Sequence, residues 1–277
     1  MGFTLNLAAD GTILAPTLTP PPADTHKYAR GAAVVVSGPA LRTGASRLSA
    51  EAALAVGAGL VTIIGERAAL VEHAAHVTAI MLRARDAEFS AIDGRVRSLL
   101  IGPGAGASDD LVEDVAGLLM RKIPIVLDAD ALTAFSAKPE MLFAMLHDQT
   151  VLTPHEGEFA RLFPEASLDD RAKATSYASG RAGAVVLLKG AETVIAAPNG
   201  RFATNRHASP WLATAGSGDV LAGLICGLLA QGNTAFDAAA IACWLHGDIG
   251  MRAGPGLTAD AMPTHLPLVL QRILQDA

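Results

Sequence analysis

The residues best suited to chemistry stand at positions 214–219, where the chain reads Thr-Ala-Gly-Ser-Gly-Asp and then becomes strongly apolar. Glycines just before a helix let consecutive backbone N–H groups point at one spot, and the helix start adds partial positive charge there. We therefore predict that Gly216, Ser217 and Gly218 form an anion hole, which the two glycines leave bare for a phosphate.

Asp219 closes this loop, and its carboxylate has two interpretations. At the head of a helix it could simply cap the first turn by accepting a hydrogen bond from a backbone N–H. Beside an anion hole it could instead accept the proton of a substrate hydroxyl that attacks phosphorus. The position alone favours neither interpretation, and the bare loop next to it favours the base.

A second glycine cluster occupies positions 102–106, where Gly102, Gly104 and Gly106 alternate with other residues. This alternation lacks the G-x-G-x-x-G spacing of a dinucleotide-binding fold and disfavours that fold. Two interpretations remain. The cluster is a tight turn between a strand and a helix, or a bare backbone surface at the carboxyl edge of a sheet, where open α/β proteins bind ligands.

Polar side chains also follow three other predicted strands. They are Asp128 and Asp130 after 125–127, His155, Glu156 and Glu158 after 151–154, and Lys189 after 185–188. Each has an ordinary structural explanation, since acidic residues, for example, favour the first turn of a helix. Because parallel strands bring their carboxyl ends to one edge, we predict that these side chains meet there and form the active site.

The elements that must position these residues alternate along the chain. Short apolar runs predict strands at 32–37, 60–65, 77–82, 98–102, 123–128, 151–153 and 184–189. Helical stretches are predicted between them at 44–58, 66–75, 109–121, 156–163 and 168–181. This alternation predicts an α/β fold with a mostly parallel central sheet and helices on both faces.

Two later segments differ from this alternation. Residues 192–205 hold two strand-like runs around Asn199-Gly200, which predicts one antiparallel hairpin. The helices expected at 220–230 and 236–252 are apolar all round, which places them in the interior.

The domain organisation is predicted from the prolines and the length. Prolines at 16, 20, 21 and 22 keep residues 1–25 from forming long regular structure, so we expect an extended N-terminal arm. Residues 26–277 are predicted to form a single domain, since α/β folds of this size commonly share one core.

Composition excludes several classes of protein. The chain has 277 residues, 51% of them hydrophobic, and a net charge of −6, which argues against disorder and against a broad nucleic-acid surface. The mean hydropathy is +0.37, but polar residues interrupt the longest uncharged stretch, 220–236, before it could span a membrane. No signal peptide is recognised, and a cytoplasmic location is expected.

The metal-ligating residue types form no zinc-like spacing. Cys226 and Cys243 fall in apolar helical patterns, so we expect them to be buried and reduced. His73 and His76 stand three residues apart on a predicted helix with no further ligands nearby, so we expect both on the surface.

The order of these motifs resembles that of the NAD(P)H-hydrate dehydratases, repair enzymes with a ribokinase-like fold. The segments that carry the resemblance are Lys27 with 31–38, 57–62, 102–104, 127–132, 153–158, 188–190 and 216–219. The resemblance as a whole extends from about His26 to about Gly254.

The resemblance implies that the S form of hydrated NADH or NADPH is dehydrated at the expense of ADP or ATP, with Mg²⁺ bridging the phosphates. Asp219 would be the catalytic base, and Gly216, Ser217 and Gly218 would stabilise the transferred phosphoryl group. Carried over by position, the nucleotide-binding residues are Lys189, Gly190, Ala191, Glu192, Thr193 and Gly218. The hydrate-binding residues are Ala40, Gly104, Gly106, His155 and Asp219, with His155 either stacking on the dinucleotide or hydrogen-bonding it.

The chain departs from the family pattern at Ser37-Gly38-Pro39-Ala40, where a second glycine and a serine are usual. Many relatives carry an epimerase domain ahead of this one, and a separate epimerase is therefore expected here. The resemblance also implies a homotetramer and, for a stand-alone bacterial form, ADP as donor. The alternatives are a vitamin-precursor kinase of the same fold, or a nucleotide-binding regulator without catalysis.

Overall fold

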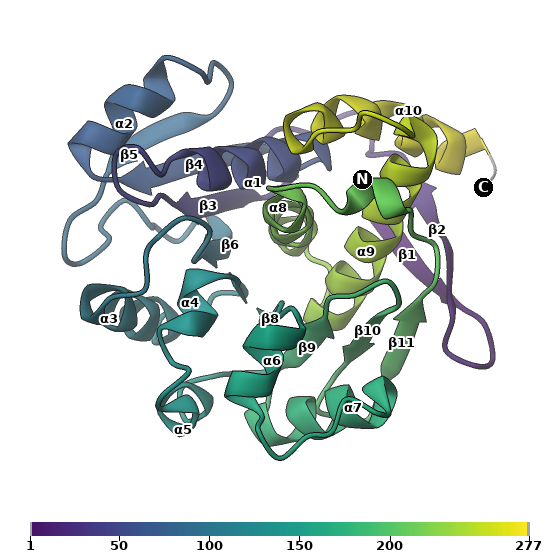
Figure 1. The fold of residues 1–277 in the computed structure, drawn as a ribbon. Helices are drawn as coiled ribbons and strands as arrows, with labels where there is room; N and C mark the ends of the chain where they lie inside the picture. The colour runs from purple at the N-terminus through teal and green to yellow at the C-terminus, as the bar shows by residue number, and fades with distance from the viewer. Residues whose placement is uncertain (1, 276–277) are drawn as a thin grey trace.

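The computed structural model describes residues 2–275, and its centre is one large twisted sheet (Figure 1). Across these residues nine strands join in the order β11-β10-β9-β8-β7-β6-β3-β4-β5. The parallel strands are β3 (Ala32–Val36), β4 (Leu60–Gly65), β5 (Met81–Ala84), β6 (Val96–Ile101), β7 (Ile125–Leu127), β8 (Thr150–Leu152) and β9 (Val185–Leu188). The hairpin of β10 (Thr193–Ala196) and β11 (Phe202–Asn205) is antiparallel, as the sequence predicted.

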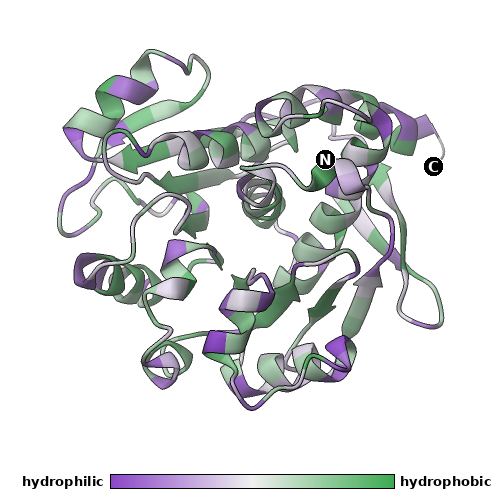
Figure 2. Cartoon of the chain, viewed as in Figure 1, coloured by the Kyte–Doolittle hydropathy of each residue, from purple (hydrophilic) through white to green (hydrophobic). Residues whose placement is uncertain are grey.

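Helices cover both faces of this sheet because the central strands are apolar on both sides. In β3, Ala33 and Val35 belong to one hydrophobic core, and Val34 and Val36 belong to the other. Figure 2 shows the consequence, with the most hydrophobic residues in the strands and the hydrophilic ones at the periphery. The chain therefore has the α/β fold with a mostly parallel central sheet and helices on both faces that the sequence predicted.

Each core is completed by its own set of helices. The first takes α1 (Gly44–Ala55), α8 (Ser217–Ala230), α9 (Ala235–Ala253) and α10 (Met262–Gln275). The second takes α3 (Asp109–Leu119), α6 (Glu156–Leu162), α7 (Arg171–Ala182) and the short helices α4 (Asp130–Thr133) and α5 (Pro139–Phe143). Helix α2 (Arg67–Ala74) packs on β4 and β5. Almost every residue of α8 is buried, which confirms its predicted place in the interior.

The N-terminal segment holds more regular structure than its prolines suggested. Strands β1 (Gly2–Leu7) and β2 (Ile13–Thr19) form a hairpin whose Ile13 and Leu18 join the core beside α9 and α10. Pro16 is tolerated because the pairing register shifts between Thr4 and Asn6, opposite this part of β2. A proline has no N–H for the ladder, and a bulge requires none.

Three other expectations are settled by the fold. The strand expected at 77–82 begins only at Met81, because a turn at 75–76 and a bend at 78–80 connect α2 to β5. Cys226 and Cys243 are free and buried, as predicted. Within residues 2–275, no helix is both long enough and apolar enough to cross a membrane.

Candidate active site

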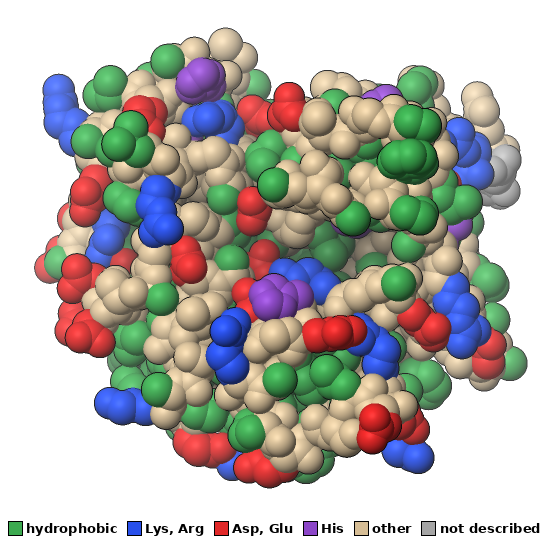
Figure 3. All heavy atoms as spheres, in the orientation of Figure 1, with side chains coloured by type: hydrophobic (Ala, Val, Ile, Leu, Met, Phe, Trp, Pro, Cys, Tyr) green, Lys and Arg blue, Asp and Glu red, His purple; other side chains and the backbone are tan. Residues whose placement is uncertain are grey.

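The polar residues predicted at the strand ends do meet at the carboxyl edge of the sheet. The loops after β3, β6, β7, β8 and β9 open toward the first turn of α8 (Figure 1). Figure 3 shows a hollow near the centre of this face, where acidic, basic and histidine side chains gather. The parallel topology therefore brings these polar side chains to one edge, as predicted.

The loop before α8 has the glycine conformation predicted for an anion hole, but of its three predicted N–H donors that of Ser217 donates to the Thr214 carbonyl oxygen at 3.2 Å. Gly216 has a φ of +88°, and a Cβ there would lie 2.6 Å from Leu48 Cδ1, so only glycine fits. Helix α8 begins at the next residue, Ser217. A Cβ built on Gly218 would lie 3.6 Å from the Lys189 ammonium, which puts a cation beside the loop.

Asp219 is not the cap of this helix. The N-cap is Gly216, and the Asp219 carboxylate makes no side-chain capping hydrogen bond. Burial raises the pKa of this half-buried carboxyl to about 6, the charges of Asp128 and Asp130 add to the rise, and Lys189 opposes it. A carboxyl poised close to neutral pH, with its oxygens free of capping, is suited to act as a base.

The cation of the site is held by a buried carboxylate. Lys189 Nζ lies 2.8 Å from Asp128 Oδ1, and the Thr153 hydroxyl donates to the same oxygen at 2.8 Å. Asp128 is 1% exposed, so its charge depends on this pairing. Although burial opposes it, the facing carboxylates raise the pKa of Lys189 and keep the ammonium charged.

The backbone is strained between Asp128 and Asp130. Ala129 has a φ of +50°, a region that L residues with a Cβ rarely adopt. Such strain persists only where surrounding structure imposes it, and it is common at functional sites. Here it places two successive aspartates at the edge, with Asp130 Oδ2 accepting a hydrogen bond of 2.6 Å from the Gly106 N–H.

The Gly102–Gly106 turn is a close-packed surface beside the loop after β3. A Cβ on Gly104 would lie 2.6 Å from the Arg42 carbonyl oxygen, and one on Gly106 would lie 2.8 Å from Arg42 Nη1. Both glycines also have positive φ. The predicted hydrate-binding residues Gly104 and Gly106 are thus brought together with the loop that carries Ala40.

Two residues of α2, Glu72 and His73, hydrogen-bond to the loop after β3. The Glu72 carboxylate accepts hydrogen bonds from the Leu41 N–H at 2.8 Å and the Thr43 hydroxyl at 3.0 Å. The expectation that His73 lies on the surface is wrong, because α2 packs it fully buried, with Nε2 2.8 Å from the Ser37 hydroxyl. Its neighbour His76 is exposed, as expected.

A cavity of about 760 Å³ opens beside the anion hole. The predicted residues that line it are Lys189, Gly190, Ala191, Thr193, His155, Ser217 and Gly218. Glu192 lies outside it, where its carboxylate pairs with Arg206 at 3.2 Å. The structure therefore divides the predicted hydrate-binding residues, since His155 shares a cavity with the nucleotide segment, whereas Ala40, Gly104 and Gly106 lie across the edge.

The imidazole of His155 is fixed by helix α6. As its N-cap, Nδ1 accepts hydrogen bonds from the N–H groups of Gly157 and Glu158, and Nε2 lies 3.5 Å from the Glu158 carboxylate. Its side chain is nevertheless 57% exposed. Nδ1 is therefore occupied by the cap, whereas the face of the ring is open to solvent.

Among the cavity residues that the sequence did not predict, two are buried and polar. They are His246 and Asn205, which line its wall from α9 and β11. The one signal available for His246 was its imidazole in the strongly apolar pattern of 236–252, and that pattern indicates a core residue rather than a site residue. The amide of Asn205 gave no signal, because its position at the end of a hairpin strand is ordinary.

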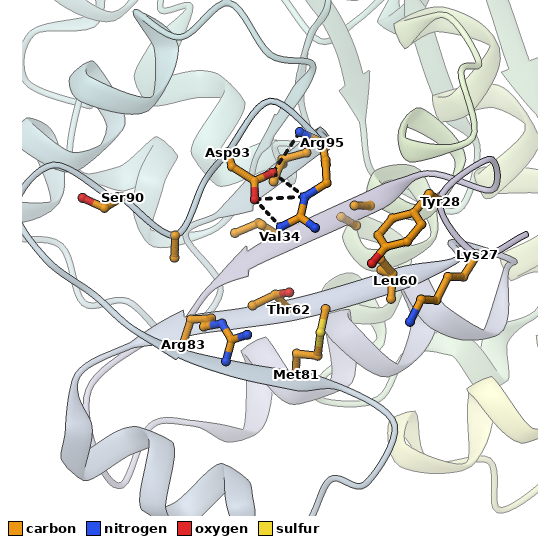
Figure 4. A pocket seen from close by; sticks show the side chains of 14 residues that line it. Lys27, Tyr28, Val34, Leu60, Thr62, Met81, Arg83, Ser90, Asp93 and Arg95 are labelled. Atoms are coloured by element: carbon orange, nitrogen blue, oxygen red, sulfur yellow. Dashed lines mark hydrogen bonds and ion pairs between the residues drawn. The ribbon is translucent and has the colours of Figure 1, made fainter.

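A smaller pocket, of about 300 Å³, lies at the opposite edge of the sheet (Figure 4). Its walls come from the first residues of β3, β4, β5 and β6 and from residues 90–95. Lys27 and Arg83 lie at its two ends, and Arg95 is held by Asp93. None of the predicted site residues lines it.

Comparison with known proteins identifies the family. A family model described as NAD(P)H-hydrate dehydratase matches residues 33–275, nearly the whole chain. The chain belongs to this family. The NAD(P)H-hydrate dehydratase match includes every strand of the main sheet except the first residue of β3.

Curated relatives are similar to this chain over about half of their own length. The bifunctional NAD(P)H-hydrate repair enzyme Nnr of Moorella thermoacetica is 38% identical over 275 residues, covering 92% of this chain and 52% of that protein. The enzyme of the same name from Mycobacterium leprae is 37% identical over 248 residues, covering 90% of this chain and 50% of that protein. The chain therefore spans about half the length of these relatives.

Solved structures agree with the family assignment. The ADP/ATP-dependent NAD(P)H-hydrate dehydratase from Bacillus subtilis, co-crystallised with ATP and Mg²⁺, has a TM-score of 0.81 and 26% identity, covering 93% of this chain and 95% of that one. A hydroxyethylthiazole kinase from Pyrococcus horikoshii has a TM-score of 0.59 and 19% identity, which shows the shared fold alone.

Proposed function

We propose that this enzyme dehydrates the S form of NADH hydrate or NADPH hydrate and consumes ADP or ATP in doing so. The observation that carries the proposal is the free carboxylate of Asp219, poised near neutral pH between the glycine loop and Lys189. The family match and the likeness to a dehydratase named for ADP and ATP support it.

The chemistry follows from this arrangement. Asp219 takes the proton of the hydrate hydroxyl as its oxygen attacks the terminal phosphorus, and the bond from that phosphorus to the rest of the nucleotide breaks. The phosphorylated oxygen then leaves carbon as inorganic phosphate, and loss of a ring proton restores the reduced nicotinamide. With ADP, the products are NADH or NADPH, AMP and phosphate.

The electrostatics suit a transferring phosphoryl group. The N–H groups of Gly216 and Gly218 and the hydroxyl of Ser217 are at the positive end of α8, and the ammonium of Lys189 lies beside them, whereas the Ser217 N–H donates to the Thr214 carbonyl oxygen at 3.2 Å. Groups held in place before reaction need no reorganisation as charge develops. The net charge of −6 makes such local donors necessary, because the protein as a whole repels phosphates.

In this proposal the nucleotide and the hydrate bind on different sides of Asp219 along the carboxyl edge. The cavity lined by Lys189, Gly190, Ala191 and Thr193 takes the nucleotide. The loop of Ala40 and the turn of Gly104 and Gly106 take the hydrate, with its hydroxyl directed to Asp219. His155, whose Nδ1 caps α6 and whose ring is exposed, stacks on the dinucleotide at the boundary.

Mg²⁺ fits this site as a companion of the nucleotide. Among residues 2–275, no three His, Cys, Asp or Glu side chains gather in a way that could hold a metal ion. Mg²⁺ commonly binds through substrate phosphates, water and one or two carboxylates. Asp130, which has no ion-pair partner within the described residues, is the carboxylate we propose for it. When bound, the ion would neutralise phosphate charge.

Three further proposals rest on the resemblance. ADP is the preferred donor, the assembly is a homotetramer, and an NAD(P)H-hydrate epimerase activity supplies the S form of the hydrate. The repair enzymes named bifunctional among the relatives support a functional link of the last kind.

The test is a recovery of reduced-nicotinamide absorbance. Purified protein is mixed with hydrated NADH or NADPH, Mg²⁺, and either ADP or ATP. Recovery with one nucleotide establishes both the reaction and its donor. Failure with both nucleotides in folded protein would contradict the proposal and favour a small-molecule kinase, to be sought among hydroxylated vitamin precursors.

A further inference from the structure

The imidazole of His246 is buried beside the anion hole and has no part in the chemistry described above. It lies on α9, which packs against α8, and it is 9% exposed. Its Nε2 lies 2.9 Å from the Ser217 hydroxyl oxygen and 3.1 Å from the Ser217 carbonyl oxygen. Among residues 2–275, both hydrogen bonds of the ring therefore go to the first residue of α8.

The carbonyl contact decides which ring nitrogen carries the proton. A carbonyl oxygen only accepts hydrogen bonds, so the contact with Ser217 O requires hydrogen on Nε2. Burial lowers the pKa of His246 to about 4, the carbonyl of Ser217 opposes this change, and the charge of Lys189 adds to it. The ring is thus neutral near physiological pH, with its one hydrogen on Nε2.

This tautomer has a consequence for the serine. Because Nε2 is a donor, the Ser217 hydroxyl cannot give its own hydrogen to the ring. That hydrogen stays free for another acceptor, and Ser217 and His246 both line the cavity beside the glycine loop. An oxygen of the transferred phosphoryl group is an acceptor of the required kind.

We propose that His246 is a positioning residue, which holds Ser217 and the first turn of α8 so that the serine hydroxyl and the loop N–H groups point at the transferred phosphoryl group. The inference rests on the proposed function, and it adds a residue from a different helix to the phosphate site. An imidazole buried in an apolar helix needs a hydrogen-bond partner, and Ser217 provides it on two atoms.

The first experiment compares two substitutions of His246. Glutamine places an amide N–H where Nε2 stood, and alanine removes the donor. We expect H246A to lower kcat about tenfold to a hundredfold, while the Kd of ADP measured by calorimetry changes little. H246Q should recover most of kcat. A loss that glutamine does not recover, or an equal loss of ADP affinity, would overturn the proposal.

A double-mutant cycle with S217A gives a readout that general destabilisation would not produce. If His246 acts through Ser217, adding H246A to S217A should lower kcat much less than it does in the wild-type protein. Fully additive losses would contradict the proposal. Thermal unfolding curves of the variants check that each protein is still folded at the assay temperature.

The pH profile separates positioning from acid–base catalysis. Because His246 stays neutral above about pH 5, H246Q should leave the acid limb of kcat/KM where Asp219 sets it. Disappearance of that limb would show that His246 itself exchanges the proton. Wild-type activity is measured first: if it is absent, the proposed function fails, whereas active wild type with an unaffected H246A fails only the inference about His246.

Discussion

Each edge of the central sheet carries a pocket with an ion pair, and the pair is buried at the carboxyl edge but exposed at the amino edge. At the carboxyl edge, Lys189 and Asp128 are 61 residues apart in sequence, and their side chains are 20% and 2% exposed. At the amino edge, Arg95 and Asp93 are two residues apart, and their side chains are 67% and 45% exposed. Distant elements are needed to build the first pair, whereas a local turn suffices for the second.

The difference in burial between the two ion pairs is the reason that we expect catalysis at the carboxyl edge. A charge removed from water interacts strongly with its neighbours, so burial and the charges of Asp128 and Asp130 raise the pKa of Asp219, and Lys189 opposes this rise. Exposed charges are screened by water and salt, and an ion pair between them contributes little. The four predictions below test this contrast.

The largest effect is expected from Asp219→Asn. The amide cannot accept the hydroxyl proton, so kcat/KM should fall by about 10² to 10⁴ while ADP still binds. Absorbance recovery and calorimetry measure the two quantities. Asp93→Asn, the matched change at the amino edge, should leave both unchanged. Substantial activity in the Asp219 variant would remove it as the base.

Lys189→Met tests the buried pair. It leaves the buried carboxylate of Asp128 without its cation, and removal of one partner of such a pair lowers the free energy of unfolding by about 3–5 kcal/mol. Urea denaturation measures this change. Arg95→Met is the control, and its unfolding midpoint should coincide with that of the wild type. Equal destabilisation by both substitutions would contradict the contrast between the edges.

The pH dependence tests the coupling between carboxylates. Asp219 must be ionised to act as a base, so kcat/KM should fall as the pH drops through about 6. Asp128→Asn removes a negative charge that raises this pKa and frees Lys189, which lowers it, so the acid limb should move to lower pH. A limb that stays in place or moves to higher pH would show that Asp128 does not act on Asp219.

The smallest effect is expected from Lys27→Ala combined with Arg83→Ala. Both side chains are exposed at the pocket of Figure 4 and line no part of the cavity beside α8. Surface substitutions of this kind change free energies by about 0.5 kcal/mol or less, so kcat/KM should stay within about twofold of the wild type. A tenfold loss would show that the amino edge is coupled to the reaction.

Local patterns predicted much of the fold correctly. Strand β4 and the hairpin of β10 and β11 were predicted from β-branched runs and from Asn199-Gly200, because these signals depend on neighbouring residues. The hairpin at the N-terminus was not predicted, since its stability comes from packing against α9 and α10 and its proline sits at an irregularity in the pairing. The prediction for His73 was wrong for the same reason, because His73 is buried where α2 packs on the sheet, despite the polarity of its side chain.

The amino-acid sequence by itself determined the alternation of strands and helices, the glycine loop before α8 and the residue types at the strand ends, because each depends on backbone preferences within a few residues. The tertiary structure decided the rest. Only folding brings Asp128, Lys189 and Asp219 together from separate elements, shifts the pKa values of Lys189 and Asp219, and places His246 of one helix against Ser217 of another. Those properties depend on distance and on exclusion of water, which no local pattern specifies.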